Sequence, residues 1–192
     1  MKYLFSLILL FSFNSTFAQD EIIWADTCKL QISDFRSASS RVGDANSYSL
    51  QTGSGIGFAY QMSTAQFAFT KNFNDKVETS FNRKAAILIA PDSAMALKLL
   101  SYAQYDFDLS ELYARRLRKK LYEAKKASSN SSFFEPIYKD IQIELSERRS
   151  NASQASNVGL NEEVIQKLHQ EVKEELATLA NFCKSCKPKK NK

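Results

Sequence analysis

The sequence contains very little histidine: His169 is the only one among its 192 residues. Zinc sites are usually built from several histidine or cysteine side chains, four in a structural site and three plus water in a catalytic one. A zinc site made of several histidines is therefore excluded. His169 lies beside the apolar stripe of a predicted helix, and we interpret it as a residue at the boundary of the core.

Glycine is scarce as well, with five residues in the chain. Gly53, Gly55 and Gly57 occupy alternate positions, and no helix start follows them. They are therefore not the glycine-rich loop that binds phosphate ahead of a helix. We expect them to allow a bulge or a close approach of the backbone in a strand region.

The chain has three cysteines, and two of them, Cys183 and Cys186, are separated by two positions. This spacing occurs in redox pairs and in half of a zinc site. A zinc site would need both Cys28 and His169 as further ligands. A redox pair normally opens a helix, whereas this pair follows one. We favour a structural disulfide, either Cys183–Cys186 or one of these with Cys28, and metal and redox roles remain alternatives.

Long apolar runs are absent after the N-terminus. Residues 3–13 form an apolar run that follows Lys2 and precedes the small residues around Ala18, which is the pattern of a secretory signal peptide. A buried helix or a membrane anchor is the alternative, but the run is short for a bilayer span. We expect residues 1–18 to be cleaved. The mature chain would then be exported, periplasmic or extracellular, without a membrane span.

An extreme charge is also absent, since the formal net charge is +5. The basic residues cluster at 115–120 and in the C-terminal tail. A solvated helix end accounts for the first cluster, so we expect no nucleic-acid partner. The hydrophobic fraction of 44% and the charged fraction of 24% are ordinary for a globular protein. We expect a single domain over 19–183 and a disordered basic tail over 184–192.

The apolar residues that are present predict an α+β fold. Period-two alternation with many aromatic residues over 47–90, including Phe67 and Phe69, indicates an antiparallel meander. A long helix with one apolar face is predicted from Asp92–Ser93 to about Ala127. Two more helices should follow, one starting near Phe134 and one from about Asn161, separated by a polar break over 150–157. We expect a small antiparallel sheet packed on the long helix, completed by the two C-terminal helices.

The segment 97–121, LKLLSYAQYDFDLSELYARRLRKKL, resembles the metal-site helix of a bacterial family of unknown function described as secreted zinc-dependent proteases. Helices of that family carry a motif of the form LLxHEQxHFDxxExYARxLR. The upstream LQISDF, residues 30–35, is similar to the family's L-x-W-x-DF opening. The resemblance covers most of 22–180, and it is specific only over 99–118. It implies a metallopeptidase-like α+β domain.

The chain departs from the family at the positions that carry the chemistry. In an H-E-x-x-H helix two imidazoles hold zinc and the glutamate acts as base. Tyr102 stands at the first histidine position, Ala103 at the glutamate and Asp106 at the second histidine. Val158 corresponds to the family's third ligand in a looser alignment. Neither tyrosine nor valine replaces a neutral imidazole, and alanine moves no proton. We therefore expect no catalytic residue, no metal and no cofactor.

Several functions remain open from the sequence. The favoured one is an exported, non-catalytic relative of the metallopeptidases, a pseudoenzyme that binds a peptide or envelope partner through the former cleft at Tyr102, Asp106 and Tyr113, or binds nothing there. One alternative is a hydrolase with a carboxylate-based site that uses Asp106, Asp108 or Glu111, since paired carboxylates can perform acid–base chemistry or bind a hard cation. Another is a structural envelope protein. We expect Asp108 and Glu111 to form ion pairs with Arg115 or to cap backbone groups.

Overall fold

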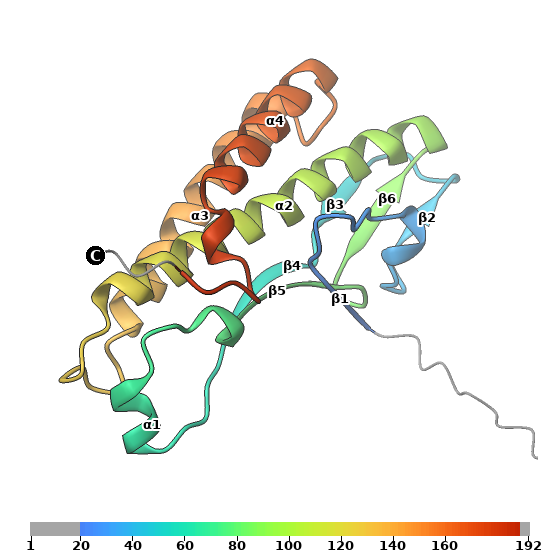
Figure 1. Ribbon diagram of the computed structural model, residues 1–192. Helices are drawn as coiled ribbons and strands as arrows, with labels where there is room; N and C mark the ends of the chain where they lie inside the picture. Colours follow the sequence, from blue (N-terminus) through green and yellow to red (C-terminus); the bar gives the residue numbers. More distant parts are fainter. Residues whose placement is uncertain (1–19, 189–192) are drawn as a thin grey trace, which may run out of the picture.

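Helix α2 (Ser93–Ala124) lies at the centre of the molecule, with two helices along one side and short strands along the other (Figure 1). The computed structural model describes residues 20–188, so the predicted signal peptide lies outside the described residues. The carboxylate of Asp92 accepts a hydrogen bond of 2.8 Å from the Met95 amide and caps the first turn. No glycine or proline interrupts the helix, which ends three residues before the predicted Ala127.

The first sheet is antiparallel and has the strand order β1-β5-β4. It consists of β1 (Glu21–Ile23), β4 (Ser54–Phe58) and β5 (Val77–Asn82). Side chains of β5 alternate between buried and half-buried, with Val77, Thr79 and Phe81 on the buried face. This is the period-two pattern that predicted a strand here, and the buried face packs on α2.

The second sheet contains a parallel pair, which the prediction of one antiparallel sheet missed. Strand β2 (Arg41–Val42) pairs in parallel with β6 (Ile87–Ala90), and β3 (Ser49–Gln51) pairs with β6 in antiparallel orientation. Strand β2 lies inside a polar stretch, residues 36–46, that is rich in serine and contains glycine and aspartate. Two residues are too few to show a period, so the pattern could not reveal it.

The strand predicted through Phe67 and Phe69 is a helix instead, α1 (Thr64–Phe69). The Ser63 hydroxyl accepts from the Gln66 amide, and the Gln66 side chain accepts from the Ser63 amide. This capping box favours a helical turn over the alternation of aromatic and small residues. Residues two apart point to different sides of a helix, so Phe67 is buried while Phe69 is exposed.

Helices α3 (Glu135–Ser156) and α4 (Glu162–Thr178) form an antiparallel hairpin on α2. The polar break predicted over 150–157 was wrong, because α3 continues to Ser156 and buries Ala152 and Ser156 on its inner side. The chain leaves the helix through three consecutive left-handed residues, Asn157, Val158 and Gly159, with φ of 48°, 54° and 90°.

Gly159 is required at this turn for space as well as for backbone conformation. A Cβ atom placed there would lie 2.5 Å from the Lys98 carbonyl oxygen and 3.0 Å from the Tyr102 Cβ. The α3–α4 turn therefore touches the backbone of α2 directly. This contact fixes the hairpin on the first half of the central helix.

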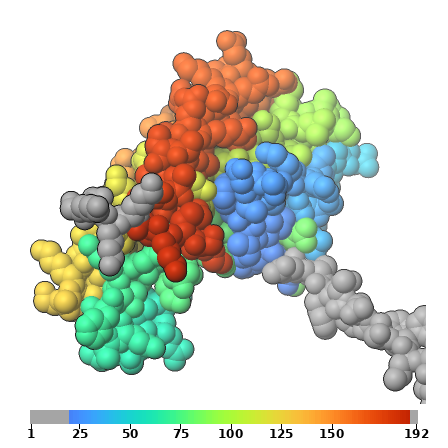
Figure 2. Space-filling view, viewed as in Figure 1, coloured from blue at the N-terminus to red at the C-terminus, as the bar shows by residue number. Residues whose placement is uncertain are grey.

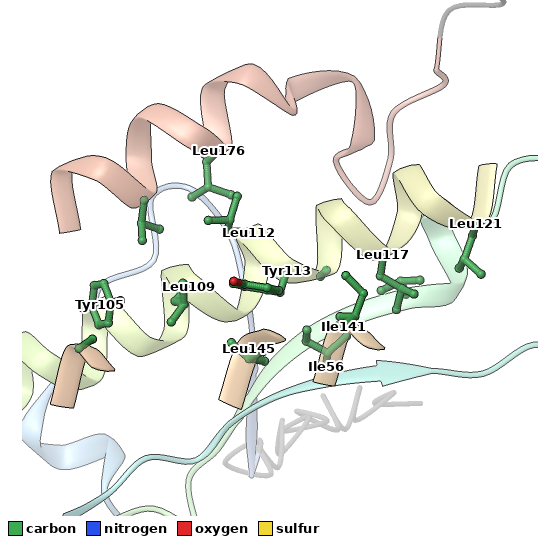
Figure 3. Close-up of a cluster of buried hydrophobic side chains, with 14 of the residues drawn as sticks. Ile56, Tyr105, Leu109, Leu112, Tyr113, Leu117, Leu121, Ile141, Leu145 and Leu176 are labelled. Atoms are coloured by element: carbon green, nitrogen blue, oxygen red, sulfur yellow. The ribbon is translucent and has the colours of Figure 1, made fainter. Parts of the chain in front are cut away.

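The fold is α+β, as predicted, and its core surrounds α2. The larger hydrophobic cluster joins α2 to α3, α4 and the first sheet. Figure 3 shows its side chains, with Leu112 of α2 facing Leu176 of α4 and Ile56 of β4 near Ile141 of α3. A second cluster includes Leu88 of β6 and Ala103 and Phe107 of α2. Because partners surround α2, its middle is buried on every side, not on one face only.

Short 3₁₀ turns connect the remaining chain: η1 (Ile32–Asp34), η2 (Asn74–Lys76) and η3 (Ala180–Phe182). After η3, Cys183 and Cys186 form a disulfide, and Cys28 is a free thiol. The Cys186 carbonyl accepts hydrogen bonds from the side-chain amides of Asn72 and Asn74 at 3.2 and 3.0 Å. Among residues 20–188, no helix has the length and apolar character needed to cross a membrane.

Candidate functional site

The residues predicted from the resemblance to occupy a former metal site lie where the α3–α4 hairpin covers the first half of α2. Tyr102 is 7% exposed, and its hydroxyl donates a hydrogen bond of 3.1 Å to the Arg149 carbonyl of α3. Burial, followed by the nearby charge of Asp106, raises the pKa of Tyr102 to about 12. The hydroxyl is therefore a neutral donor that ties α2 to α3 at ordinary pH.

Ala103 and Val158 are packing residues. Ala103 is fully buried in the cluster that also holds Leu99 and Phe107. Val158, predicted to stand at the position of the third ligand, is half-buried and packs against both core clusters. Its left-handed φ is unusual for a β-branched residue. Neither side chain carries a group that binds metal or transfers a proton.

Asp106, predicted to stand at the second histidine position, forms a buried ion pair with Arg149. Its side chain is 1% exposed. Oδ1 accepts from Arg149 Nε at 2.6 Å, and Oδ2 accepts from Arg149 Nη2 at 3.3 Å and from the Thr52 hydroxyl at 2.6 Å. A two-bond pairing with a guanidinium is strong and directional. Both carboxylate oxygens are thus already committed to protein donors.

Arg149 extends this pair into a network that joins three parts of the chain. Its Nη2 also donates to the Ser110 hydroxyl at 2.7 Å and to the Ser54 carbonyl at 3.2 Å. The network connects α2, α3 and β4. Sequence reasoning missed Arg149 because it lies 43 residues from Asp106 in a different helix, where no spacing rule relates the two.

Tyr113, the remaining residue of the predicted cleft, is also buried. The Arg116 guanidinium lies over its ring, 4.6 Å from the centroid. Tyr102, Asp106 and Tyr113 all belong to the interior of the helical layer. The place of the predicted cleft is therefore occupied by these side chains and by Arg149.

Asp108 is held by three donors and not by Arg115, as the sequence had suggested. It accepts from the Trp24 indole at 2.8 Å and from Gln104 at 3.3 Å, and its other oxygen lies 2.6 Å from His169 Nε2. Burial alone would raise the pKa of Asp108, but the hydrogen bonds from His169 and Trp24 outweigh burial, and the pKa lies below its usual value. Asp108 therefore remains a carboxylate that joins α2 to α4 and to the chain after β1.

Glu111 does pair with Arg115, as predicted, at 3.0 Å between Oε1 and Nε. It is shared with Arg118, whose Nη1 lies 2.7 Å from Oε1, and Oε2 accepts from the Thr79 hydroxyl at 2.8 Å. Glu111 borders a cavity of about 180 Å³ beneath the Cys183–Cys186 loop. The cluster contains one carboxylate and two guanidinium groups.

The interpretation of residues 115–120 as a solvated helix end was wrong for Arg115 and Arg118, which are buried. Arg118 is 1% exposed, and it also donates to the carbonyls of Val77 and Phe182 at 2.8 and 3.1 Å. Arg115 donates to the Leu176 carbonyl at 2.9 Å. These contacts connect α2 to β5, α4 and the C-terminal segment. Because other elements cover α2 on all sides, it buries residues that would be exposed on a helix with a single buried face.

Within residues 20–188, no three histidine, cysteine, aspartate or glutamate side chains gather in a way that could hold a metal ion. No known family model, curated protein or solved structure matches the chain. The resemblance to secreted zinc-dependent proteases therefore remains a prediction from the sequence. What the buried carboxylates Asp106, Asp108 and Glu111 have in common is that each joins α2 to another element.

Proposed function

We propose that this protein is an exported, non-catalytic relative of metallopeptidases, a pseudoenzyme with a structural or partner-binding role in the cell envelope. One observation carries the proposal: Asp106 is buried and bound on both oxygens by Arg149 and Thr52. A metal ligand needs a free lone pair directed at an accessible site, and this carboxylate is occupied by protein donors. The same helix position has become part of the scaffold.

The burial of Tyr102, Asp106 and Tyr113 favours the form of this proposal in which the former cleft holds no ligand. A peptide entering there would have to displace the Tyr102–Arg149 and Asp106–Arg149 contacts. A partner would instead use the outer surface of the domain. The structural role then belongs to the interior of α2 and any recognition to the exterior.

Zinc binding and peptidase activity of the full chain test the absence of catalysis. After dialysis against zinc chloride, we expect far less than one zinc per protein and no cleavage of unstructured peptides. Stoichiometric zinc, or cleavage that a chelator abolishes, would sink the proposal. For export, we expect mass spectrometry of the protein from bacterial envelope or medium fractions to show an N-terminus at Gln19. An intact Met1 in the cytoplasmic fraction would contradict it.

A carboxylate-based hydrolase is the second candidate, and the Asp108–His169 contact of 2.6 Å is the observation that favours it. The Cys28 thiol, whose pKa is influenced by the charge of Asp108, is one candidate nucleophile. Burial, followed by the charges of Asp34 and Asp108, raises the pKa of Cys28, which disfavours the reactive thiolate. Hydrolysis of simple esters that is lost in both His169→Ala and Asp108→Asn would establish this function. We expect no such hydrolysis.

A further inference from the structure

Three segments far apart in the sequence meet at one end of the molecule: the lobe 59–76 that contains α1, the loop 125–134, and the C-terminal segment 183–188 (Figure 1). The rings of Phe67 and Phe133 lie 5.9 Å apart, and the Tyr60 hydroxyl donates to the Ser131 carbonyl at 2.6 Å. Asn72 joins the lobe to the C-terminal segment through the Cys186 carbonyl. We call these three segments the basic tip.

The basic tip carries charge of almost one sign. Its sequence contains a single carboxylate, Asp75, and six lysines: Lys71, Lys76, Lys125, Lys126, Lys184 and Lys187. It contains no arginine. Three more lysines, Lys189, Lys190 and Lys192, follow outside the described residues. This imbalance contrasts with the chain as a whole, where 26 basic residues face 21 acidic ones.

Part of this charge is directed outward. Asp75 pairs with Lys76, and Lys184 pairs with Glu78 of β5. Lys126 and Lys187 are exposed, and the structure gives their ammonium groups no ion pair within residues 20–188. In Figure 2 the lobe and the loop occupy the same end of the surface, and the C-terminal part of the chain borders the lobe. The two unpaired lysines therefore add to the positive charge of the tip, while the exposed carboxylates of Glu123 and Glu135 flank the loop 125–134.

An exposed aromatic side chain lies on the same tip. Phe69, in the last turn of α1, is 91% exposed and is the most exposed large hydrophobic residue described. The capping box at Ser63 forces Phe67 and Phe69 onto different sides of α1, so only Phe67 can join the core. The lobe projects from the rest of the domain (Figure 1). Phe69 can therefore reach a surface beyond the molecule without rearrangement of the core.

We propose that the basic tip binds the surface of an anionic phospholipid bilayer, with the lysines near the headgroup phosphates and Phe69 in the interfacial layer. Lysines attract anionic lipid over a diffuse surface, and an aromatic side chain adds apolar burial at the same interface. Lysine lacks the planar fork with which arginine recognises one carboxylate or phosphate, so a lipid surface suits the tip better than a specific acidic peptide. A second copy of the tip would be repelled by like charge.

Vesicle sedimentation of the full chain tests this proposal, independently of whether the protein is an enzyme. Vesicles of phosphatidylglycerol and phosphatidylcholine are compared with vesicles of phosphatidylcholine alone, at low salt. We expect binding only to the anionic vesicles. Addition of 0.5 M salt should release the protein, because it shortens the electrostatic screening length to about 4 Å. Every variant keeps the same N-terminus, so any binding by the apolar run 3–13 is common to all of them.

Matched variants locate the binding surface. Lys126→Gln with Lys187→Gln should weaken partitioning by about 30-fold, and Phe69→Ser by about tenfold. Lys29→Gln with Lys167→Gln makes the same charge change away from the tip, and Leu97→Ser removes another exposed apolar residue, 59% exposed, near the start of α2. Both controls should bind as the parent does. All substituted residues are exposed, and unchanged circular dichroism and thermal midpoints verify folding.

Three results would overturn the proposal. The first is equal binding to neutral vesicles. The second is an equal loss of binding in the control variants. The third is retention on an immobilised acidic polypeptide without vesicle binding, which would assign the tip to a protein partner.

Discussion

Two of the three buried carboxylates of helix α2, Asp106 and Glu111, pair with arginine in different ways. Asp106 has one arginine, from α3, whose side chain is still 30% exposed. Glu111 has two arginines from its own helix, and both are buried. The first pair joins elements far apart in the sequence and reaches solvent. The second is closed within the interior and is completed by backbone carbonyls of neighbouring elements.

This difference determines what is left behind when the carboxylate is removed. Arg149 can turn toward water after the loss of Asp106, whereas Arg118 cannot. An unpaired charge in the interior is far more costly than the net stabilisation that the intact pair provides. Removal of the carboxylate should therefore lower the free energy of unfolding more at Glu111 than at Asp106.

The largest effect is expected for Glu111→Ala, which leaves two buried guanidinium groups without a counter-ion. We expect the free energy of unfolding to fall by about 3–5 kcal/mol, measured by urea denaturation. Glu123→Ala, at an exposed position of the same helix, is the matched control and should change stability by less than about 0.5 kcal/mol. A loss below about 1 kcal/mol for Glu111→Ala would contradict the expected cost of leaving the two buried guanidinium groups unpaired.

Asp106→Ala should lower the free energy of unfolding by less, about 2 kcal/mol. The Arg149 guanidinium can be hydrated on its exposed side, while Thr52 loses its hydrogen-bond acceptor and Tyr102 loses a neighbouring side chain. A double-mutant cycle with Arg149→Ala measures the pair itself. Arg149→Lys should be less stable than the parent protein, since an ammonium cannot reproduce the two-bond contact with Asp106. Equal losses for Asp106→Ala and Glu111→Ala would remove the distinction between open and closed pairs.

Removal of the Cys183–Cys186 disulfide tests how far the Glu111 cluster depends on the C-terminal segment. Cys183→Ser with Cys186→Ser releases a small loop whose neighbour Phe182 supplies a carbonyl to Arg118. For so short a loop we expect a loss of about 1–2 kcal/mol. When the cysteine double variant is combined with Glu111→Ala, the two losses of stability should not be additive. When it is combined with Asp106→Ala, they should be additive. Cys28→Ser is the control, with little change expected.

The smallest effect concerns Asp108, which lies between the two pairs on α2. Its pKa in the folded chain lies below the ordinary value of 3.8. The unfolded chain therefore binds this proton more readily, and the stability from Asp108 is complete above pH 3.8 and is lost as the pH falls through the folded pKa. Asp108→Asn should lower stability at neutral pH by about 1 kcal/mol. Its loss of stability below pH 3.8 should also be shallower than that of the parent, and parallel curves would contradict this.

Local patterns in the sequence predicted the features that depend on short range. The cap at Asp92, the start of α4 after Asn161 and the Glu111–Arg115 pair follow from rules about neighbouring residues in a helix. Strand β5 followed from strict alternation over six residues. These features need no knowledge of what the rest of the chain does.

The partners of Asp106 and Asp108 depend on tertiary packing instead. Arg149 and His169 lie in other helices, and only the α3–α4 hairpin brings them to α2. Burial of Arg115 and Arg118 could not be predicted for the same reason, since a basic run at a helix end is usually solvated. At α1, a capping box decided against the aromatic alternation. The packing of other elements around α2, and not the local sequence of the helix, gives its buried polar residues their partners.

The turn after α3 also offers a criterion for finding relatives of this chain. Gly159 has no room for a side chain beside Tyr102, and the residue before it must accept a left-handed backbone. A distant relative that shares this packing should keep glycine at this position and an aromatic residue at the facing position of the central helix. This should hold even where the overall sequence identity is very low. Such a signature selects candidates by a steric requirement and does not depend on the predicted resemblance to zinc-dependent proteases.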